Sequence, residues 1–327
     1  MPRYISHNAT SEGPHCQAEP EKTAMSIRPV RHQSTATPHL EGAGVHLKRA
    51  FGFDDPSLTD PFLLFDDFRN SQPENYIKGF PWHPHRGIET ITYVLAGTVE
   101  HGDSLGNTGT LGAGDVQWMT AGSGIMHQEM PKGDFTGKMH GFQLWANLPS
   151  SLKMTAPRYQ DVTAADIPVE IDDDGTAARI ICGEFWGKRG PVDGIAAEPS
   201  YVDISVPPGR KKTFKVDAYR SAFAYIFAGS GSFRDASKPF GVLVEKEVEG
   251  EEIQIRDMSG DRTLVVFDTG DEITVQAGDE GIRFLLVSGK PIKEPVAWHG
   301  PIVMNNRAEL IQAVTELQNG TFIKPAH

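Results

Sequence analysis

The chain has 327 residues, 39% of them hydrophobic, and a formal net charge of -12. This length can supply two hydrophobic cores, while the acidic charge argues against a surface that binds nucleic acid phosphates or anionic membranes. Cysteine occurs only at Cys16 and Cys182, so neither a disulfide framework nor a cysteine-based zinc site can form. No stretch approaches the roughly 20 apolar residues that cross a bilayer, and the N-terminus lacks the apolar core of a secretory signal. We therefore expect a cytoplasmic protein that binds neither membranes nor nucleic acid directly.

The pattern along the chain predicts an all-β protein. Residues 1–25 are polar and without periodicity, as is typical of a flexible extension. From about residue 27 to 300, short runs of β-branched and aromatic residues alternate with clusters of Gly, Pro, Asp and Asn. A weak helical signal occurs at 163–167, and a stronger one predicts a helix near 306–318, with Asn306 and Glu309 as a capping box.

A faint internal repeat suggests that the β region is duplicated. TYVLAGTV at 92–99 aligns with AYIFAGSG at 224–231, which places Tyr93 opposite Tyr225. Repeats of this kind indicate that one structural unit occurs twice.

The motif HPHRG at 83–87 contains two histidines around Pro84. If residues 83–95 are extended, alternation places His83, His85 and Glu89 on one face. Because proline cannot donate a ladder hydrogen bond, the motif should lie at the start of a strand or at a sheet edge. Taken alone, an H-x-H of this kind is more often a turn or surface feature than a metal site.

A second pair of candidate ligands, His127 and Glu129, follows in GSGIMHQEMP. In an extended segment these two side chains also share a face. Three imidazoles and one carboxylate suit a divalent ion such as Fe, Mn, Ni, Cu, Co or Zn, and without thiolates a closed structural zinc site is less attractive. Spacing alone leaves both a metal site and two ordinary polar turns open.

Longer motifs carry a resemblance to a known family. GFPWHPHRGIETITYVLAG and GDVQWMTAGSGIMHQEMP resemble the two cupin motifs. Together with PFLLFDDF at 61–68, GFQLWANLP at 141–149 and EPVAWHGPIVMN at 294–305, they resemble the pirin family. The resemblance extends from about residue 26 to 317.

Pirins are bicupins with one metal ion, usually iron, in the first domain. The resemblance therefore implies two jelly-roll-like β-barrel domains in tandem, at 26–160 and 161–327, with the short helix at the C-terminal end. The metal ligands that it implies are His83, His85, His127 and Glu129. Fe(II) is the expected ion. Glu89 is not expected to bind it and should at most contact the ligands.

The second domain is expected to be free of metal. In the repeat alignment, Lys215, Asp217 and Ser221 take the places of His83, His85 and Glu89. No cofactor other than the metal is expected.

Two functions follow from the resemblance. The first is a quercetin 2,3-dioxygenase, which cleaves a flavonol with O2 and releases CO, with Glu129 as the group that accepts the substrate proton. The alternative is an iron-dependent redox-sensing regulator that binds a transcription factor or a metabolic enzyme. In either case we expect a monomer.

Overall fold

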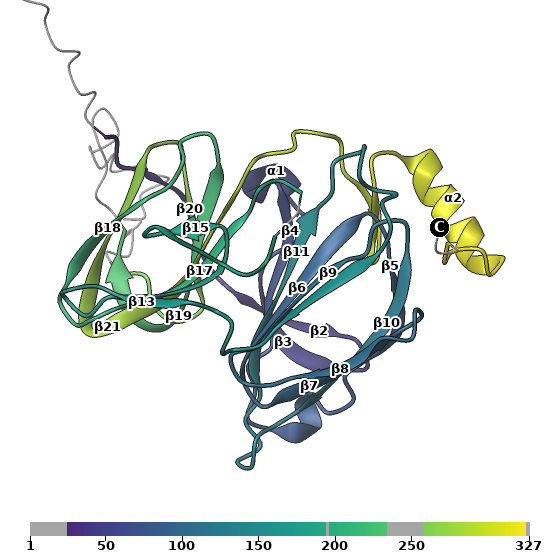
Figure 1. The fold of residues 1–327 in the computed structure, drawn as a ribbon, viewed down its shortest axis with the longest axis horizontal. Helices are drawn as coiled ribbons and strands as arrows, with labels where there is room; N and C mark the ends of the chain where they lie inside the picture. The colour runs from purple at the N-terminus through teal and green to yellow at the C-terminus, as the bar shows by residue number, and fades with distance from the viewer. Residues whose placement is uncertain (1–24, 194–195, 234–257, 325–327) are drawn as a thin grey trace, which may run out of the picture.

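The computed structural model describes residues 25–193, 196–233 and 258–324, which form two β-rich halves side by side (Figure 1). In these ranges the helices are α1 (Pro56–Thr59), α2 (Arg307–Gln318) and the 3-10 turn η1 (Pro73–Asn75). None of the described helices is long and apolar enough to cross a membrane. The predicted extension at 1–25 lies outside the described residues except for Met25.

The first half encloses its interior between two sheets. The larger sheet has, in spatial order, the strands β12 (Arg158–Val162), β9 (Val116–Thr120), β6 (Ile88–Ala96), β11 (His140–Asn147), β4 (Phe62–Asp67), β3 (Val45–Phe51) and β2 (Thr37–Glu41). The smaller sheet has the order β5 (Phe80–His85), β10 (Ile125–Lys132), β7 (Thr98–Asp103) and β8 (Thr108–Leu111). The strand β5 therefore lies at a sheet edge, as Pro84 predicts.

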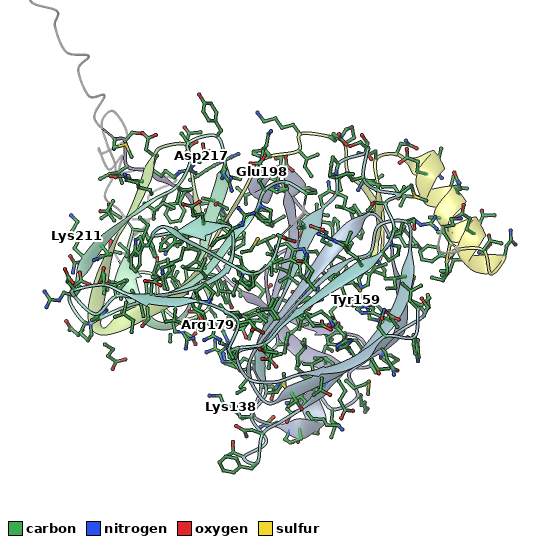
Figure 2. All side chains as sticks on the ribbon, viewed as in Figure 1. Lys138, Tyr159, Arg179, Glu198, Lys211 and Asp217 are labelled. Carbon is green, nitrogen blue, oxygen red and sulfur yellow. The ribbon has the colours of Figure 1, made fainter. Side chains whose placement is uncertain are left out.

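The second half is formed mainly by one sheet that curves around an apolar interior. Its order is β1 (Val30–Thr35), β20 (Thr263–Phe267), β19 (Ser221–Ser232), β21 (Glu272–Gly289), β17 (Ser200–Val206), β14 (Ala177–Cys182) and β13 (Val169–Ile171), and β18 (Lys211–Lys215) also pairs with β21. Two small hairpins complete the described strands: β15 (Glu184–Phe185) with β16 (Lys188–Arg189), and β22 (Ala297–His299) with β23 (Ile302–Met304). Side chains fill both halves, and Arg179 at their junction donates to the carbonyl of Ala164 over 2.7 Å (Figure 2).

Both ends of the chain cross to the half that is distant in sequence. The early strand β1 pairs with β20 of the second half. The late strand β23 packs on the first half, because the backbone N–H of Val303 donates to the carbonyl of Arg86 over 3.0 Å. Gly87 permits this approach, since a Cβ at that position would lie 1.9 Å from the Val303 oxygen.

The two large sheets meet in a shared core in which the repeat is visible. Tyr93 of the first half donates to Asp203 of the second over 2.8 Å, and Tyr225 of the second half donates to Asp67 of the first over 3.0 Å. The two tyrosines are those that the sequence repeat aligns. The buried aromatic and aliphatic residues around them come from both halves.

The two helix predictions have different outcomes. The C-terminal helix is confirmed: Asn306 caps α2 by accepting from the N–H of Glu309 over 3.0 Å, and α2 packs against β22 and β23. The helix at 163–167 is wrong. Thr163 there accepts from the N–H of Asp166 and its hydroxyl donates to the Asp166 carboxylate, so the segment closes as a turn.

Candidate metal centre

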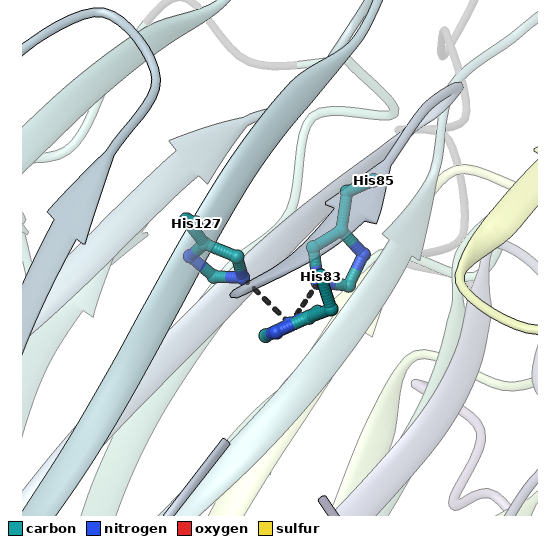
Figure 3. A group of neighbouring side chains, drawn as sticks. All are labelled: His83, His85 and His127. Atoms are coloured by element: carbon teal, nitrogen blue, oxygen red, sulfur yellow. Dashed lines mark hydrogen bonds between the residues drawn. The ribbon is translucent and has the colours of Figure 1, made fainter. Parts of the chain in front are cut away.

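Pairing between β5 and β10 brings the two histidine motifs together. In this antiparallel register His127 lies directly opposite His83, and His85 lies opposite Ile125. Because alternate residues of a strand share a face, His85 points the same way as His83. The three imidazoles therefore form one group on the inner side of the smaller sheet (Figure 3).

Glu89 does not belong to this group. The chain turns at Gly87, which has φ of 76°, and Glu89 lies on β6 in the other sheet. Its carboxylate accepts from the Thr120 hydroxyl over 2.8 Å, and it shares the interface-facing side of β6 with Ile91 and Tyr93. The expected common face across residues 83–95 is therefore wrong, because the alternation does not continue through the turn.

The donor atoms of the three-histidine cluster (His83, His85 and His127) fit one metal ion. The Nε2 atom of His83 lies 3.0 Å from that of His85 and 2.9 Å from that of His127. Two nitrogens, each about 2.1 Å from one ion, lie ~3.0 Å apart when their bonds meet at a right angle. The Nδ1 atom of His83 lies 2.8 Å from the carbonyl of Pro81, which holds the ring proton on Nδ1 and leaves Nε2 as an acceptor. The single lone pair on Nε2 of His83 cannot accept hydrogen bonds from both His85 and His127 well. One cation, by contrast, can bind the Nε2 lone pairs of all three rings.

The surroundings of the cluster favour neutral imidazoles. Burial, followed by the charges that the neighbouring rings would carry, holds the pKa of His85 and of His127 well below the ordinary histidine value. Burial also lowers the pKa of His83. Neutral imidazole is the form that binds a metal, so the cluster needs no proton release in order to do so.

Glu129 lies on the same face of β10 as His127 but outside the tight group. In the described part of the chain, the candidate ligand atoms that lie within 4.8 Å of one another are those of the three histidines. The Glu129 carboxylate is buried and 3.0 Å from the hydroxyl of Thr92, which lies 2.7 Å from the side-chain amide of Gln143. Burial raises the pKa of Glu129 to about 7, and the hydrogen bond from Thr92 opposes this rise.

The hydroxyl of Thr92 has one proton and two acceptor neighbours, so its hydrogen bonds depend on the state of Glu129. When Glu129 is ionised, Thr92 donates to it and the Gln143 amide turns its NH2 group toward Thr92. When Glu129 is protonated, the chain of hydrogen bonds reverses. Thr92 thus holds the carboxyl group in place in both states.

A cavity of about 490 Å³ is lined by His83 and His85 of the three-histidine cluster and by Glu129. This volume lies within the range of small-molecule sites, about 300 to 1,000 Å³. The cavity lining also includes the side chains of Phe53, Thr92, Gln143, Trp145 and Trp298. The site can therefore admit an organic molecule next to the histidines.

Two buried cations fix the chain beside the cluster. Arg86, next to His85, donates to the carbonyls of Ser123 and Phe322 over 2.7 and 2.9 Å and pairs with Glu316 of α2 over 2.8 Å. Lys153 donates to the carbonyls of Gly87 and Val303 over 2.9 and 3.1 Å. The C-terminal residues therefore support the loop that follows the H-x-H motif.

The sequence-based reasoning missed several of these residues. Thr92 and Gln143 do carry a signal, because period-2 alternation from Tyr93 on β6 and from Phe142 on β11 places them on the inner face. Phe53 and Trp298 carried no local signal, since their role depends on contacts between distant segments.

Comparison with known proteins agrees with this architecture. The family model described as pirin matches residues 44–146, and the model of the pirin C-terminal cupin domain matches residues 201–323. A pirin-like protein of Caulobacter vibrioides is 41% identical, over 91% of this chain and 100% of that protein. One from Solanum lycopersicum is 39% identical, over 86% of this chain and 88% of the relative.

A solved structure gives the same result. The crystal structure of quercetin 2,3-dioxygenase from Acinetobacter baumannii matches with a TM-score of 0.78 and 30% identity, over 90% of this chain and 98% of that one. Two tandem cupin domains, with a three-histidine site in the first and a short C-terminal helix, define a bicupin. Within that class, the chain belongs to the pirin family.

Proposed function

We propose that the protein is a quercetin 2,3-dioxygenase, which cleaves a flavonol with O2 and releases CO. The observation that carries this proposal is the convergence of three histidines, two of which, His83 and His85, line a cavity of about 490 Å³. The quercetin 2,3-dioxygenase that is 30% identical over 90% of this chain supports it. The proposed substrates are a small aromatic molecule and O2.

We propose His83, His85, His127 and Glu129 as the ligands of one divalent ion, with Fe(II) as the first candidate and Mn, Ni, Cu, Co or Zn as alternatives. When bound, such an ion supplies a Lewis acid that lowers the pKa of the flavonol 3-hydroxyl. Metal analysis of protein purified without added metal tests the identity of the ion. Cytoplasmic location and a monomeric state stay predictions.

The chain's own groups then have separate tasks. Glu129 accepts the proton of the 3-hydroxyl, because its carboxylate is the buried base beside the histidines. Thr92 keeps that carboxyl group oriented before and after the transfer. The apolar side chains of the cavity exclude water from the electron-rich flavonolate, which then reacts with O2.

The test is turnover of quercetin by metal-loaded protein under air. We expect loss of flavonol absorbance together with O2 uptake and CO release, and none of these in protein stripped of metal. The variant Glu129→Gln should lower kcat by about 10²- to 10⁴-fold, the usual contribution of a general base. Metal-loaded protein that leaves quercetin intact would show that this is not the activity.

A further inference from the structure

Three aromatic side chains form a continuous wall from the three-histidine cluster to the surface. The Trp145 ring meets His85 edge to face, with centroids 5.1 Å apart and planes at 89°. The centroid of Phe53 lies 6.2 Å from that of Trp145, with planes at 68°, and Trp298 stacks on Phe53 at 4.5 Å with planes at 22°. We call Trp145, Phe53 and Trp298 the aromatic wall; all three line the cavity.

The outer end of the aromatic wall comes from the far end of the chain. Trp298 lies in β22, and the hairpin of β22 and β23 packs on the first half beside β5. The Trp298 side chain is 49% exposed, whereas Trp145 and Phe53 are half-buried. This gradient of exposure places Trp298 at the mouth of the cavity and Trp145 near the histidines.

The charged groups of the cavity lining leave little attraction for an anion. Arg49 donates to the Asp66 carboxylate over 2.8 and 2.7 Å and also pairs with Glu41 over 2.9 Å. Its charge is therefore compensated within the protein, and the polar side of the cavity offers hydrogen bonds through Thr92 and Gln143. A wall of aromatic rings beside the hydrogen-bonding groups of Thr92 and Gln143 suits an aromatic molecule with hydroxyl groups better than a carboxylate or a phosphate.

We propose that the aromatic wall binds a planar hydroxylated aromatic molecule and that Trp298 is the residue that selects for planarity. The inference rests on the proposed function, because the bound molecule is its substrate. Stacking against aromatic rings requires ring planes that can lie flat, so a puckered analogue loses the contact while keeping its hydroxyl groups. Trp298 then acts on binding, at a distance from the reacting atoms.

The test is equilibrium binding without O2, followed by turnover with O2. Metal-loaded protein is titrated anaerobically with quercetin and with the dihydroflavonol that has the same hydroxyl groups and a saturated C2–C3 bond. We expect Trp298→Leu to weaken quercetin binding about tenfold, dihydroflavonol binding less than threefold, and Trp298→Phe to restore most of the difference. In turnover, Trp298→Leu should raise KM about tenfold with kcat within twofold.

Two controls separate recognition from damage to the hairpin. Phe135→Ala removes a fully exposed aromatic side chain of the same half that does not line the cavity, and it should leave both affinities unchanged. Metal content per chain should stay equal in all variants. Equal weakening of both ligands by Trp298→Leu, or no weakening, would overturn the inference.

The two proposals can fail separately. Quercetin that binds anaerobically with the expected dependence on Trp298, but is not consumed under air, overturns the dioxygenase and supports the aromatic wall. Quercetin that is consumed equally well by wild type and Trp298→Leu overturns the aromatic wall alone.

Discussion

The two halves of the molecule are hollowed at corresponding places but differ in what lines the hollow. In the first half, His83 and His85 face a cavity of about 490 Å³. In the second half, a cavity of about 460 Å³ is lined by residues that include Lys215 and Asp217, the positions aligned with those histidines. Both of these side chains are exposed, and Asp217 accepts from the N–H of Tyr219 over 3.0 Å instead of facing a ligand cluster (Figure 2).

Where the halves meet, they are alike. Each presents one tyrosine of the repeat to a buried aspartate of the other, and each aspartate is also paired with an arginine: Asp203 with Arg283 and Asp67 with Arg69. The duplicated fold thus depends on the shared interface, whereas the candidate metal site depends on a few side chains of one strand pair. Each of these two dependences can be tested separately.

Removing a ligand should produce the largest effect. In His85→Ala, metal content should fall from one ion per chain to none, because the cluster loses a donor. The stabilisation by metal should also vanish, which is about 4 kcal/mol when the ion is supplied at 1,000 times its Kd. Metal analysis and thermal unfolding with and without the ion measure both effects.

The matched change in the second half is Asp217→Ala, which should keep one ion per chain. A His85→Ala protein that retains a full equivalent of metal would contradict the assignment of the cluster.

The next effect concerns Glu89, a buried carboxyl group of the first half on the side of β6 that faces the interface. Burial raises its pKa to about 7, from the ordinary 4.5. The folded state therefore holds the proton more tightly than the unfolded state; this stabilisation is complete below pH 4.5 and is lost as the pH rises through about 7. The difference amounts to about 3 kcal/mol, so Glu89→Gln should be more stable than wild type by that amount at pH 8 and nearly equal to it at pH 4.5.

Denaturant unfolding across this pH range measures the difference. The exposed Glu280 of the second half provides the control, since Glu280→Gln should follow the wild-type curve within about 0.5 kcal/mol. If the free energies of unfolding of the wild type and of Glu89→Gln differ by the same amount at every pH, burial does not raise the pKa of Glu89.

The third and smallest effect concerns the two interface tyrosines, and it should be of similar size for both. Tyr93→Phe and Tyr225→Phe each remove one hydrogen bond to a buried carboxylate, which costs about 2 kcal/mol. Equilibrium unfolding should give similar losses for both, and Tyr219→Phe, at an exposed tyrosine, should give none. A loss of stability in only one of the two interface variants would mean that the two hydrogen bonds do not contribute equally to the free energy of unfolding.

Local patterns predicted the parts of the fold that depend on neighbouring residues. Alternation correctly placed His83 beside His85, and the cap at Asn306 marked the start of α2. The same rule failed at Glu89, because a glycine with positive φ at position 87 ends one strand and starts another in a different sheet. Sequence alternation does not show where a strand changes sheets.

Contacts between distant segments could not be predicted. Nothing near Trp298 indicates that it stacks on Phe53, and nothing near Arg86 indicates that Glu316 of α2 neutralises it. Such pairs follow from the crossing of the chain ends, which is a property of the complete fold. The long motifs that resemble pirins predict candidate ligands but carry no information on these contacts.

The crossing of the chain ends also has a consequence for the order of events during synthesis. Arg86 is held by the carbonyl of Phe322, and Lys153 by the carbonyl of Val303. On a ribosome, the H-x-H motif therefore emerges long before the residues that support it, and this support is complete only after Phe322 has been synthesised. A fragment that ends near residue 160 therefore lacks the residues that support the H-x-H motif.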